Sequence, residues 1–216
     1  MKSINLLKKE DLKMPKIFLL LAISLILLTV KGYCITEIIE VNTEIQKEKY
    51  IPFLLSKGKS QIEDLVKYTL KMNPHLETEY VKTIAQTYID EALIEGINYD
   101  IAYAQMLLET GILKFNGIVS KEQHNFSGIG ATDKFTKGSS FPNIKEGIRA
   151  HIQHLKAYAS SQNIKSSMVD PRFYLVKRGS APTIYDLTGK WAKDKLYDKK
   201  LKKILLGLLE FDNAKR

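Results

Sequence analysis

The chain has 216 residues, and 33 lysine and arginine residues against 24 aspartate and glutamate residues give it a formal net charge of +9. The length predicts one globular domain, and Cys34, the only cysteine, excludes an intrachain disulfide. The mildly basic balance favours an anionic surface or polymer such as a cell envelope, whereas no zinc-finger spacing and no basic motif interleaved with aromatic residues supports nucleic-acid binding.

An N-terminal appendage precedes the domain. Residues 1–16 contain five lysines, and residues 17–30 form an apolar run. A membrane-spanning helix needs about 20 apolar residues, so this shorter run is typical of a secretory signal, cut near residues 32–34. We expect residues 1–34 to be a signal peptide or an uncleaved signal anchor. The protein would then be exported to the periplasm or cell envelope, with membrane attachment through residues 17–30 in the second case.

The segment 35–59 is charged and mixed, which predicts a linker or loosely packed arm. Ser60 and Glu63 have the spacing of a capping box and predict a helix that ends at Asn73-Pro74. Apolar residues at helical spacing predict a second helix from about residue 77 to residue 95, followed by Gly96.

The third predicted helix ends in a carboxylate, Glu109. Apolar residues recur at helical spacing over 101–108, with Asn98 or Asp100 as the N-terminal cap. Apolar surroundings and the negative end of the helix dipole both penalise the charged form of Glu109, so both raise its pKa. A raised carboxyl pKa is what a general acid needs near neutral pH. Gly111 follows, as a left-handed helix end requires.

The rest of the chain alternates between turns and two more helices. Residues 114–141 are rich in glycine and serine and predict loops or a short β-hairpin. Asn143 and Glu146 form a capping pair for a helix that ends at about residue 159, and a last helix starts near Asp194. The lysines of that last helix lie mostly on its outer face, which favours a solvated surface. The predicted fold class is mainly α, with the domain spanning residues 60–213.

The cluster from His124 to Gly130 suits sugar recognition. It combines an asparagine, an aromatic ring and exposed amide groups among glycines. A sugar ring offers hydroxyls at its edge and C–H groups on its faces, which match these groups. The glycine-rich turns between Glu109 and this cluster let a polymer approach the backbone closely.

Four motifs in chain order resemble those of the bacterial peptidoglycan glucosaminidases, glycoside hydrolase family 73. The resemblance covers roughly residues 60–209, and it implies a lysozyme-like helical fold with a short Gly-rich loop or hairpin insertion. The motifs are Ala104-Gln105-Met106-Leu107-Leu108-Glu109-Thr110-Gly111, Asn125-Phe126-Ser127-Gly128-Ile129, Phe141-Pro142-Asn143-Ile144-Lys145-Glu146-Gly147-Ile148 and Trp191-Ala192-Lys193-Asp194-Lys195-Leu196-Tyr197.

The resemblance also implies an activity and a set of site residues. The activity is endo-β-N-acetylglucosaminidase, which cleaves β-1,4 bonds of peptidoglycan glycan strands, with Glu109 as the proton donor to the glycosidic oxygen. Trp191 stands where the family often has a tyrosine, and its indole can stack on a sugar face but has no hydroxyl. The implied substrate-binding residues are Gln105, Asn125, Phe126, Gly128, Trp191 and Tyr197.

The identity of a second catalytic group is open. Asp133 is the only acid between Gly130 and Phe141, where family members often have a glutamate. It is either the base or a turn-forming aspartate. A positioned water and the acetamido group of the substrate are candidates for the same role, and so is Glu122. Glu146 is interpreted as a helix cap.

Three functional hypotheses compete. The first is the hydrolase; the second is a lytic transglycosylase, in which a muramic hydroxyl attacks internally and no second carboxylate is needed. The third is a wall-binding protein without activity, suggested by Trp191 and the missing hairpin glutamate. His151 and His154 lie three residues apart, but without an acidic or cysteine partner at zinc-motif spacing we expect no metal and no cofactor. The sequence makes no prediction of oligomeric state.

Overall fold

The computed structural model describes residues 52–131 and 135–213. The predicted signal or anchor at 1–34, and the predicted arm as far as residue 51, lie outside the described residues. Within them, no helix is long and apolar enough to cross a membrane.

The described chain is mainly α-helical, as predicted, and is consistent with the expected lysozyme-like domain. No strand forms in 52–131 or 135–213. Three short 3-10 helices, η1 (Lys121–Gln123), η2 (Phe173–Leu175) and η3 (Tyr185–Leu187), lie in the connections. The α-helices are α2 (Ile62–Met72), α3 (Thr78–Glu95), α4 (Tyr99–Glu109), α5 (Ile144–Ala159) and α6 (Tyr197–Asn213).

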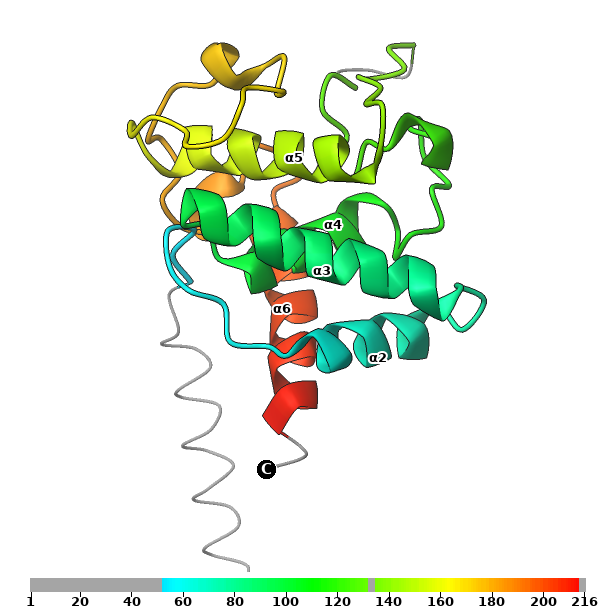
Figure 1. Ribbon diagram of the computed structural model, residues 1–216. Coiled ribbons are helices and arrows are strands. Elements are labelled where there is room, and N and C mark those ends of the chain that lie inside the picture. Colours follow the sequence, from blue (N-terminus) through cyan, green and yellow to red (C-terminus); the bar gives the residue numbers. More distant parts are fainter. Residues whose placement is uncertain (1–51, 132–134, 214–216) are drawn as a thin grey trace, which may run out of the picture. The chain divides into compact units, whose positions relative to one another are not determined.

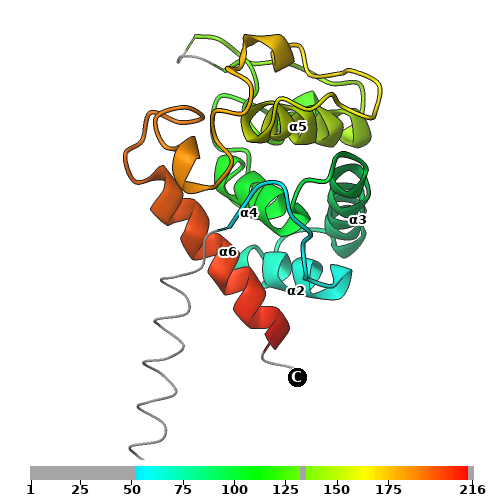
Figure 2. The same ribbon diagram turned by 90° about the vertical axis from the view of Figure 1, so that its left-hand side faces the viewer.

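Helix α4 is the centre of the helical packing. It contacts α3, α5 and α6, and α2 packs against α3 and α6 around it (Figures 1 and 2). Nine of the 11 residues of α4 are buried, from Tyr99 to Leu107. A helix that is apolar nearly all round has to be enclosed by others. Glu109, its last residue, therefore emerges directly from the core.

Local capping chemistry sets several helix ends as predicted. The Asn98 side chain caps α4 by accepting hydrogen bonds from the N–H groups of Asp100 and Ile101, and Asn143 caps α5 in the same way. Gly96 ends α3 in the left-handed region, with φ of 74°.

The predicted capping box at Ser60 is wrong. Gln61 occupies the N-cap position of α2 and makes no side-chain cap hydrogen bond, while the Ser60 hydroxyl is buried without a partner among the described residues. The backbone N–H groups of Lys59 and Ser60 instead donate to the carboxylate of Asp100, at 2.7 and 3.3 Å. A tertiary contact with α4 thus holds the start of α2, which local spacing cannot reveal.

Residues before position 60 also pack in the helical domain, although the domain was expected to start at residue 60. Leu54 is fully buried, its N–H donates to the Pro182 carbonyl at 2.8 Å, and its carbonyl accepts from the N–H of Asn98 at 2.8 Å. The described end of the predicted arm is therefore part of the helical domain.

The glycine-rich segment 114–141 forms turns around η1. The Ser139 N–H donates to the Ile129 carbonyl at 2.8 Å, and Gly130 and Gly138 have φ of 82° and 76°. No strand forms among its described residues; 132–134 are not described. The predicted loop is present, whereas the predicted β-hairpin gains no support.

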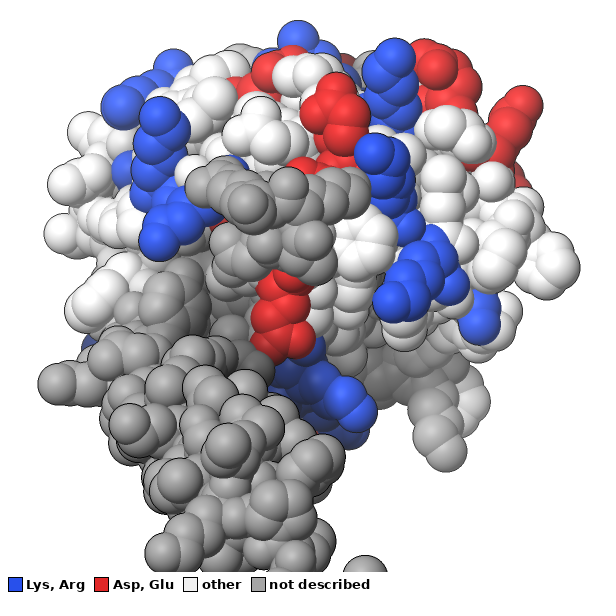
Figure 3. Space-filling view, turned by 90° about the horizontal axis from the view of Figure 1, so that it is seen from below, with Lys and Arg blue, Asp and Glu red and all other residues white. Residues whose placement is uncertain are grey.

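Helix α6 begins at Tyr197, three residues after the predicted start, because Asp194 shapes a turn first. Its carboxylate accepts from the Leu196 N–H at 2.9 Å and its carbonyl from the Tyr197 N–H at 3.1 Å. Leu201, Leu205 and Leu208 then face the core. On the face shown in Figure 3, lysine and arginine side chains are scattered among acidic and uncharged residues, as expected of a solvated surface.

Candidate active site

The chain turns sharply after Glu109. Gly111, Ile112 and Leu113 have φ of 58°, 60° and 58°, so the predicted left-handed residue at 111 is confirmed and two more follow it. The Thr110 hydroxyl holds this turn by donating to a carbonyl of α4 at 2.8 Å and accepting from the Leu113 N–H at 2.9 Å. Left-handed backbone is costly for a β-branched residue such as Ile112, and such strain clusters at functional sites.

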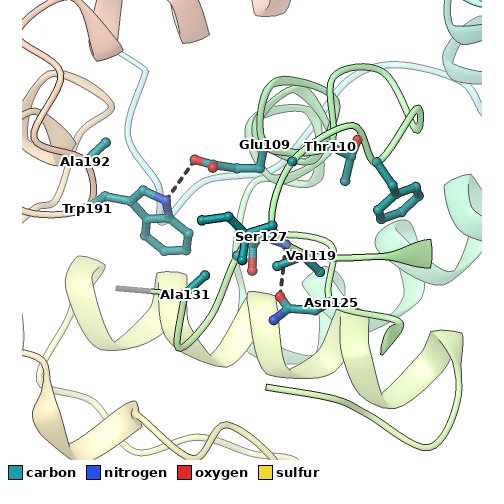
Figure 4. Close-up of a pocket in the computed structure, with 12 residues that line it drawn as sticks. Glu109, Thr110, Val119, Asn125, Ser127, Ala131, Trp191 and Ala192 are labelled. Atoms are coloured by element: carbon teal, nitrogen blue, oxygen red, sulfur yellow. Dashed lines mark hydrogen bonds between the residues drawn. The ribbon is translucent and has the colours of Figure 1, made fainter. Parts of the chain in front are cut away.

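Glu109 lines an open pocket of about 240 Å³ (Figure 4). In this view Trp191 points toward Glu109 from one side, while Ser127 and Ala131 lie on the opposite side. Glu109 is the only carboxylate among the described residues that line the pocket. The full lining is Glu109, Thr110, Phe115, Gly117, Ile118, Val119, Asn125, Ser127, Gly128, Ala131, Trp191 and Ala192.

Two hydrogen bonds fix one oxygen of the Glu109 carboxyl group. The Tyr197 hydroxyl donates to Oε1 at 2.5 Å, and the Trp191 indole N–H donates to the same oxygen at 3.0 Å. Oε2 has no hydrogen-bond partner among the described residues. The indole replaces a phenol here without loss of a donor, because the donor is its ring N–H.

The pKa of the Glu109 carboxyl is raised above its usual value of 4.5. Burial of the carboxyl is the main cause, and the hydrogen bonds from Tyr197 and Trp191 lower the pKa by less than burial raises it. Glu109 is exposed to the open pocket, yet the concave wall replaces much of the water around its carboxyl with protein. A raised pKa keeps a larger fraction of this group protonated near neutral pH.

A chain of hydrogen bonds runs from Glu109 into the core. The Tyr197 oxygen accepts from Nε2 of Gln105 at 2.7 Å, and Oε1 of Gln105 lies 3.0 Å from Nε2 of His151. Nδ1 of His151 lies 2.8 Å from the Tyr88 hydroxyl. We call this set, Tyr88, His151, Gln105 and Tyr197, the Glu109 hydrogen-bond chain.

The direction of this chain follows from proton counting. A phenol hydroxyl can donate only one hydrogen bond, and Tyr197 donates it to Glu109. Gln105 must therefore present its NH₂ group to Tyr197 and its carbonyl to His151. His151 therefore has its proton on Nε2, and Nδ1 accepts from Tyr88. Every donor in the chain points toward Glu109.

The protonation states of the chain are consistent with this direction. Burial, with a smaller effect from His154, lowers the pKa of His151 from 6.5 to about 3, so its ring is neutral. Burial and the charge of Glu109 raise the pKa of Tyr197 well above 10, so its hydroxyl keeps its proton and stays a donor.

Trp191 is held by an aromatic cluster behind the pocket. Its ring lies 5.1 Å from that of His154, in an edge-on arrangement, and 5.6 Å from the rings of His151 and Tyr158. The Nδ1 of His154 contacts the Asp170 carboxylate at 2.7 Å. Such edge contacts restrict an aromatic ring, so the indole N–H is aimed at Glu109 before any substrate binds.

Asn125 organises the opposite wall. Its amide NH₂ donates to the carbonyls of Ile129 and Ser139, both at 2.9 Å, and its carbonyl accepts from the Ile129 N–H at 3.0 Å. Asn125 is buried but lines the pocket, as does Gly128 with φ of 69°. The asparagine therefore shapes the loop that forms the pocket wall.

The predicted substrate-binding residues divide into two groups. Asn125, Gly128 and Trp191 line the pocket. Gln105, Phe126 and Tyr197 are buried behind it, at 0%, 1% and 4% exposure. These three buried side chains therefore do not contact a substrate directly. Gln105 and Tyr197 belong to the Glu109 hydrogen-bond chain, and the Phe126 ring packs edge-on against the Phe115 ring, with 6.0 Å between the ring centroids.

Neither Glu122 nor Glu146 lines the Glu109 pocket. Asp133 lies outside the described residues. Glu122 is in η1, fully exposed, and its pKa is lowered, mainly by a hydrogen bond from Ser120. Glu146 is in the first turn of α5, where its N–H donates to the side chain of Asn143 at 2.9 Å, as expected of a capping pair.

The sequence favours hydrogen bonds near the groove for His151 and His154, on α5, but the partners of these residues are not evident from it. His151 and His154 share a helical spacing, yet each faces a different partner, Gln105 and Asp170 respectively. Tyr88 has the pattern of an ordinary core residue. No group of three or more potential metal-binding side chains occurs among the described residues.

The chain is similar to known proteins. The family model described as mannosyl-glycoprotein endo-beta-N-acetylglucosaminidase matches residues 85–208, which include Glu109 and every residue that lines its pocket. A protein of Borreliella burgdorferi, named only as an uncharacterized protein, is 77% identical over 203 residues, which cover 94% of this chain and 100% of the relative.

A solved structure is also similar. It is the crystal structure of S. aureus autolysin E in complex with the muropeptide NAM-L-Ala-D-iGlu, with a TM-score of 0.48, 15% identity and 78% coverage of each chain. The family match alone spans more than half of the sequence and confirms the resemblance of the four motifs. The chain therefore belongs to the mannosyl-glycoprotein endo-beta-N-acetylglucosaminidase family, and is a glycoside hydrolase.

Proposed function

We propose that the protein is an exported endo-β-N-acetylglucosaminidase that cuts β-1,4 bonds of peptidoglycan, with Glu109 as the general acid. The observation that supports this most is the state of the Glu109 carboxyl. It lies in an open pocket, its pKa is raised by burial, and one of its oxygens is held by two donors.

The two donors decide which oxygen carries the acid proton. Oε1 already accepts from Tyr197 and Trp191, so the proton of the neutral acid resides on Oε2. This proton passes to the glycosidic oxygen as the bond to the sugar carbon breaks and an oxocarbenium-like centre develops. The carboxylate left behind is stabilised by the same two donors, since hydrogen bonds to a charged acceptor are the stronger ones.

The attacking group completes the reaction on the other face of the sugar. The candidates for this second catalytic role are Asp133 or Glu122 as a base, a positioned water, and the acetamido oxygen of the substrate. In the hydrolase each of them leads to attack by water and a new reducing end.

Peptidoglycan is the proposed polymer for three reasons. The four motifs resemble those of peptidoglycan glucosaminidases, and the 77% identical relative comes from a bacterium. The basic balance of the chain favours an anionic polymer.

The proposal of export rests on the lysine-rich and apolar pattern of residues 1–34. Fractionating cells and sequencing the N-terminus of the mature protein test it.

A lytic transglycosylase is the second candidate, and one observation favours it. Among the described residues lining the pocket, Glu109 is the only carboxylate. Internal attack by a muramic acid hydroxyl needs one acid–base group, whereas hydrolysis commonly uses two.

Mass spectrometry of digested cell walls tests the proposal. Fragments that end in reducing N-acetylglucosamine support the glucosaminidase. Fragments that end in 1,6-anhydromuramic acid assign the transglycosylase instead, and walls that yield neither product contradict both enzymes in favour of a wall-binding protein.

A further inference from the structure

A second pocket, of about 560 Å³, continues the groove beyond Trp191. It shares five lining residues with the Glu109 pocket, so the two hollows form one surface groove. Figure 4 labels four of these shared residues near Glu109: Trp191 and Ala192 from one segment and Ser127 and Ala131 from the segment after η1. The five are Ser127, Gly128, Ala131, Trp191 and Ala192.

The second pocket is basic, unlike the first. Arg172, Lys190 and Lys193 line it, and no aspartate or glutamate does so among the described residues. None of these three cations forms an ion pair with a described residue. The Lys190 ammonium donates to the Ser180 carbonyl, which is a neutral acceptor. We call this hollow the basic pocket.

Contacts with α5 fix the backbone at two of these cations, Arg172 and Lys190. The Asp170 carboxylate accepts from His154 at 2.7 Å and from the backbone N–H of Arg172 at 2.9 Å. The Lys190 carbonyl accepts from the Tyr158 hydroxyl at 2.9 Å. Both contacts come from α5, which also holds Trp191 through His154 and Tyr158. The basic pocket is thus built on the same helix as the catalytic groove.

A hydroxyl without a partner lies where the two pockets meet. Ser127 lines both, is 4% exposed, and its Oγ has no hydrogen-bond partner among the described residues. A buried polar group is costly to leave unpaired, so this hydroxyl favours a ligand that offers a hydrogen-bonding group at this point.

We propose that the basic pocket binds a carboxylate of the glycan strand next to the bond cleaved at Glu109. This rests on the proposed function. A chain of N-acetylglucosamine alone offers hydroxyl and amide groups, which need no cations. Muramic acid, in contrast, has a lactyl carboxyl group that is either free or linked to a peptide with carboxylates of its own. Arg172, Lys190 and Lys193, which form no ion pair with a described residue, and the Ser127 hydroxyl match such a group.

The test compares two variants that remove the same number of charges. Arg172→Gln/Lys190→Gln/Lys193→Gln empties the basic pocket of cations, and the control Lys67→Gln/Lys82→Gln/Lys203→Gln alters exposed lysines that line neither the Glu109 pocket nor the basic pocket. New reducing ends and anhydro ends are measured at physiological salt, where distant surface charges are screened. We expect the first variant to raise KM at least tenfold with kcat within twofold, and the control to stay within twofold in both.

The substrates identify the carboxylate. They are intact peptidoglycan, strands stripped of peptide by an amidase, and intact peptidoglycan whose carboxylates are converted to amides. A KM effect on intact peptidoglycan that disappears on stripped strands assigns the peptide carboxylates alone. An effect that persists on stripped strands shows that the lactyl carboxylate, which the amidase exposes, is bound as well. Amidated peptidoglycan should raise the KM of the unmodified protein to that of the triple variant.

Equal KM values for the triple variant and the unmodified protein on intact peptidoglycan would overturn the inference. So would a KM increase caused by the triple substitution that is as large on amidated peptidoglycan as on intact peptidoglycan. If the triple variant folds poorly, the double variant Lys190→Gln/Lys193→Gln, which keeps Arg172, takes its place and its KM values are judged by the same criteria. A protein that cleaves none of the three substrates contradicts the proposed function itself, which is a separate result.

Discussion

The Tyr197 hydroxyl donates to Oε1 of Glu109 at 2.5 Å, although the two residues lie 88 positions apart in the sequence. The phenol oxygen of Tyr197 in turn accepts from Gln105 at 2.7 Å. A phenol held on both sides has one orientation, so its proton is directed at the carboxyl group throughout the catalytic cycle. This contact joins the end of α4 to the start of α6.

Tyr197→Phe should raise the pKa of Glu109 further. The hydrogen bond from Tyr197 lowers that pKa, so its loss leaves burial less opposed. A general acid works in its protonated form, and the alkaline limb of the pH–activity profile should therefore move to higher pH. We also expect kcat to fall about 10- to 100-fold, because the carboxylate loses a donor after proton transfer.

The measurement is the pH dependence of kcat/KM on solubilised glycan strands. Tyr174→Phe, which removes the hydroxyl of an exposed tyrosine, is the control and should leave the profile in place. An alkaline limb that stays fixed or moves to lower pH in Tyr197→Phe contradicts the role assigned to this hydroxyl.

Gln105→Leu should damage both stability and activity. The substitution leaves the Nε2 proton of His151 without an acceptor and removes a donor to Tyr197. A buried polar group left unpaired costs about 1–3 kcal/mol, which should appear in urea unfolding at pH 7. Gln86→Leu, on the exposed face of α3, breaks only an exposed hydrogen bond to Asp90 and should change stability by less than about 0.5 kcal/mol.

Activity separates positioning from stability in this variant. Gln105→Leu should lower kcat at temperatures where the protein is fully folded, with little change in KM, because Gln105 does not line the pocket. A folded Gln105→Leu protein with unchanged kcat is incompatible with the Glu109 hydrogen-bond chain acting on catalysis.

His151 should make the protein sensitive to acid. Its folded pKa is lowered to about 3, mainly by burial, whereas the unfolded chain takes up this proton near pH 6.5. Above pH 6.5 the His151 ring is neutral in both states, and its protonation does not reduce the free energy of unfolding. As the pH falls from 6.5 toward about 3, only the unfolded chain takes up this proton, and the free energy of unfolding falls by at most about 1.4 kcal/mol per pH unit.

Urea unfolding between pH 7 and pH 4 measures this slope. His151→Gln removes the titrating ring, so its stability should fall less steeply with acid than that of the unmodified protein. His75→Gln, at an exposed position, should keep the original slope. Identical slopes for His151→Gln and the unmodified protein would show that this ring is not the source.

Gly147→Ala should disturb the wall that contains Asn125. A Cβ atom at Gly147 would lie 1.8 Å from the carbonyl oxygen of His124, so α5 and the chain after η1 would have to separate. We expect a loss of about 1–3 kcal/mol in the free energy of unfolding, typical of overpacking, together with weaker substrate binding. Gly117→Ala, where a Cβ would meet nothing within 4 Å, is the control and should be near neutral in stability.

The sequence predicts the parts of the fold that depend on local chemistry. Asn98 and Asn143 cap the helices after them, and Gly96 ends the helix before it, because each acts within a few residues. The position of Glu109 at the end of a buried helix is predictable for the same reason. The predicted capping box at Ser60 fails because the carboxylate of Asp100, 40 positions away, holds the backbone at that point.

The site is only partly predictable from the sequence because its supports are distant. His151 reaches Gln105 across 46 positions and Tyr88 across 63, and no local pattern reports such pairings. The four motifs locate the carboxyl group and its two donors, but not which motif residues face the pocket. The motifs predict that Gln105 and Tyr197 bind substrate, whereas burial makes them supports of Glu109 instead.

Glu109→Gln is the most direct test of the central claim. Glutamine keeps the size of the side chain and an oxygen that accepts from Trp191 and Tyr197, but it has no acid proton to give. The measurement is the rate of new glycan ends released from purified peptidoglycan by the unmodified protein and by this variant, at equal concentration and with matched folding. The account predicts a rate at least about 100-fold lower for Glu109→Gln. A variant that releases glycan ends at the rate of the unmodified protein would contradict it.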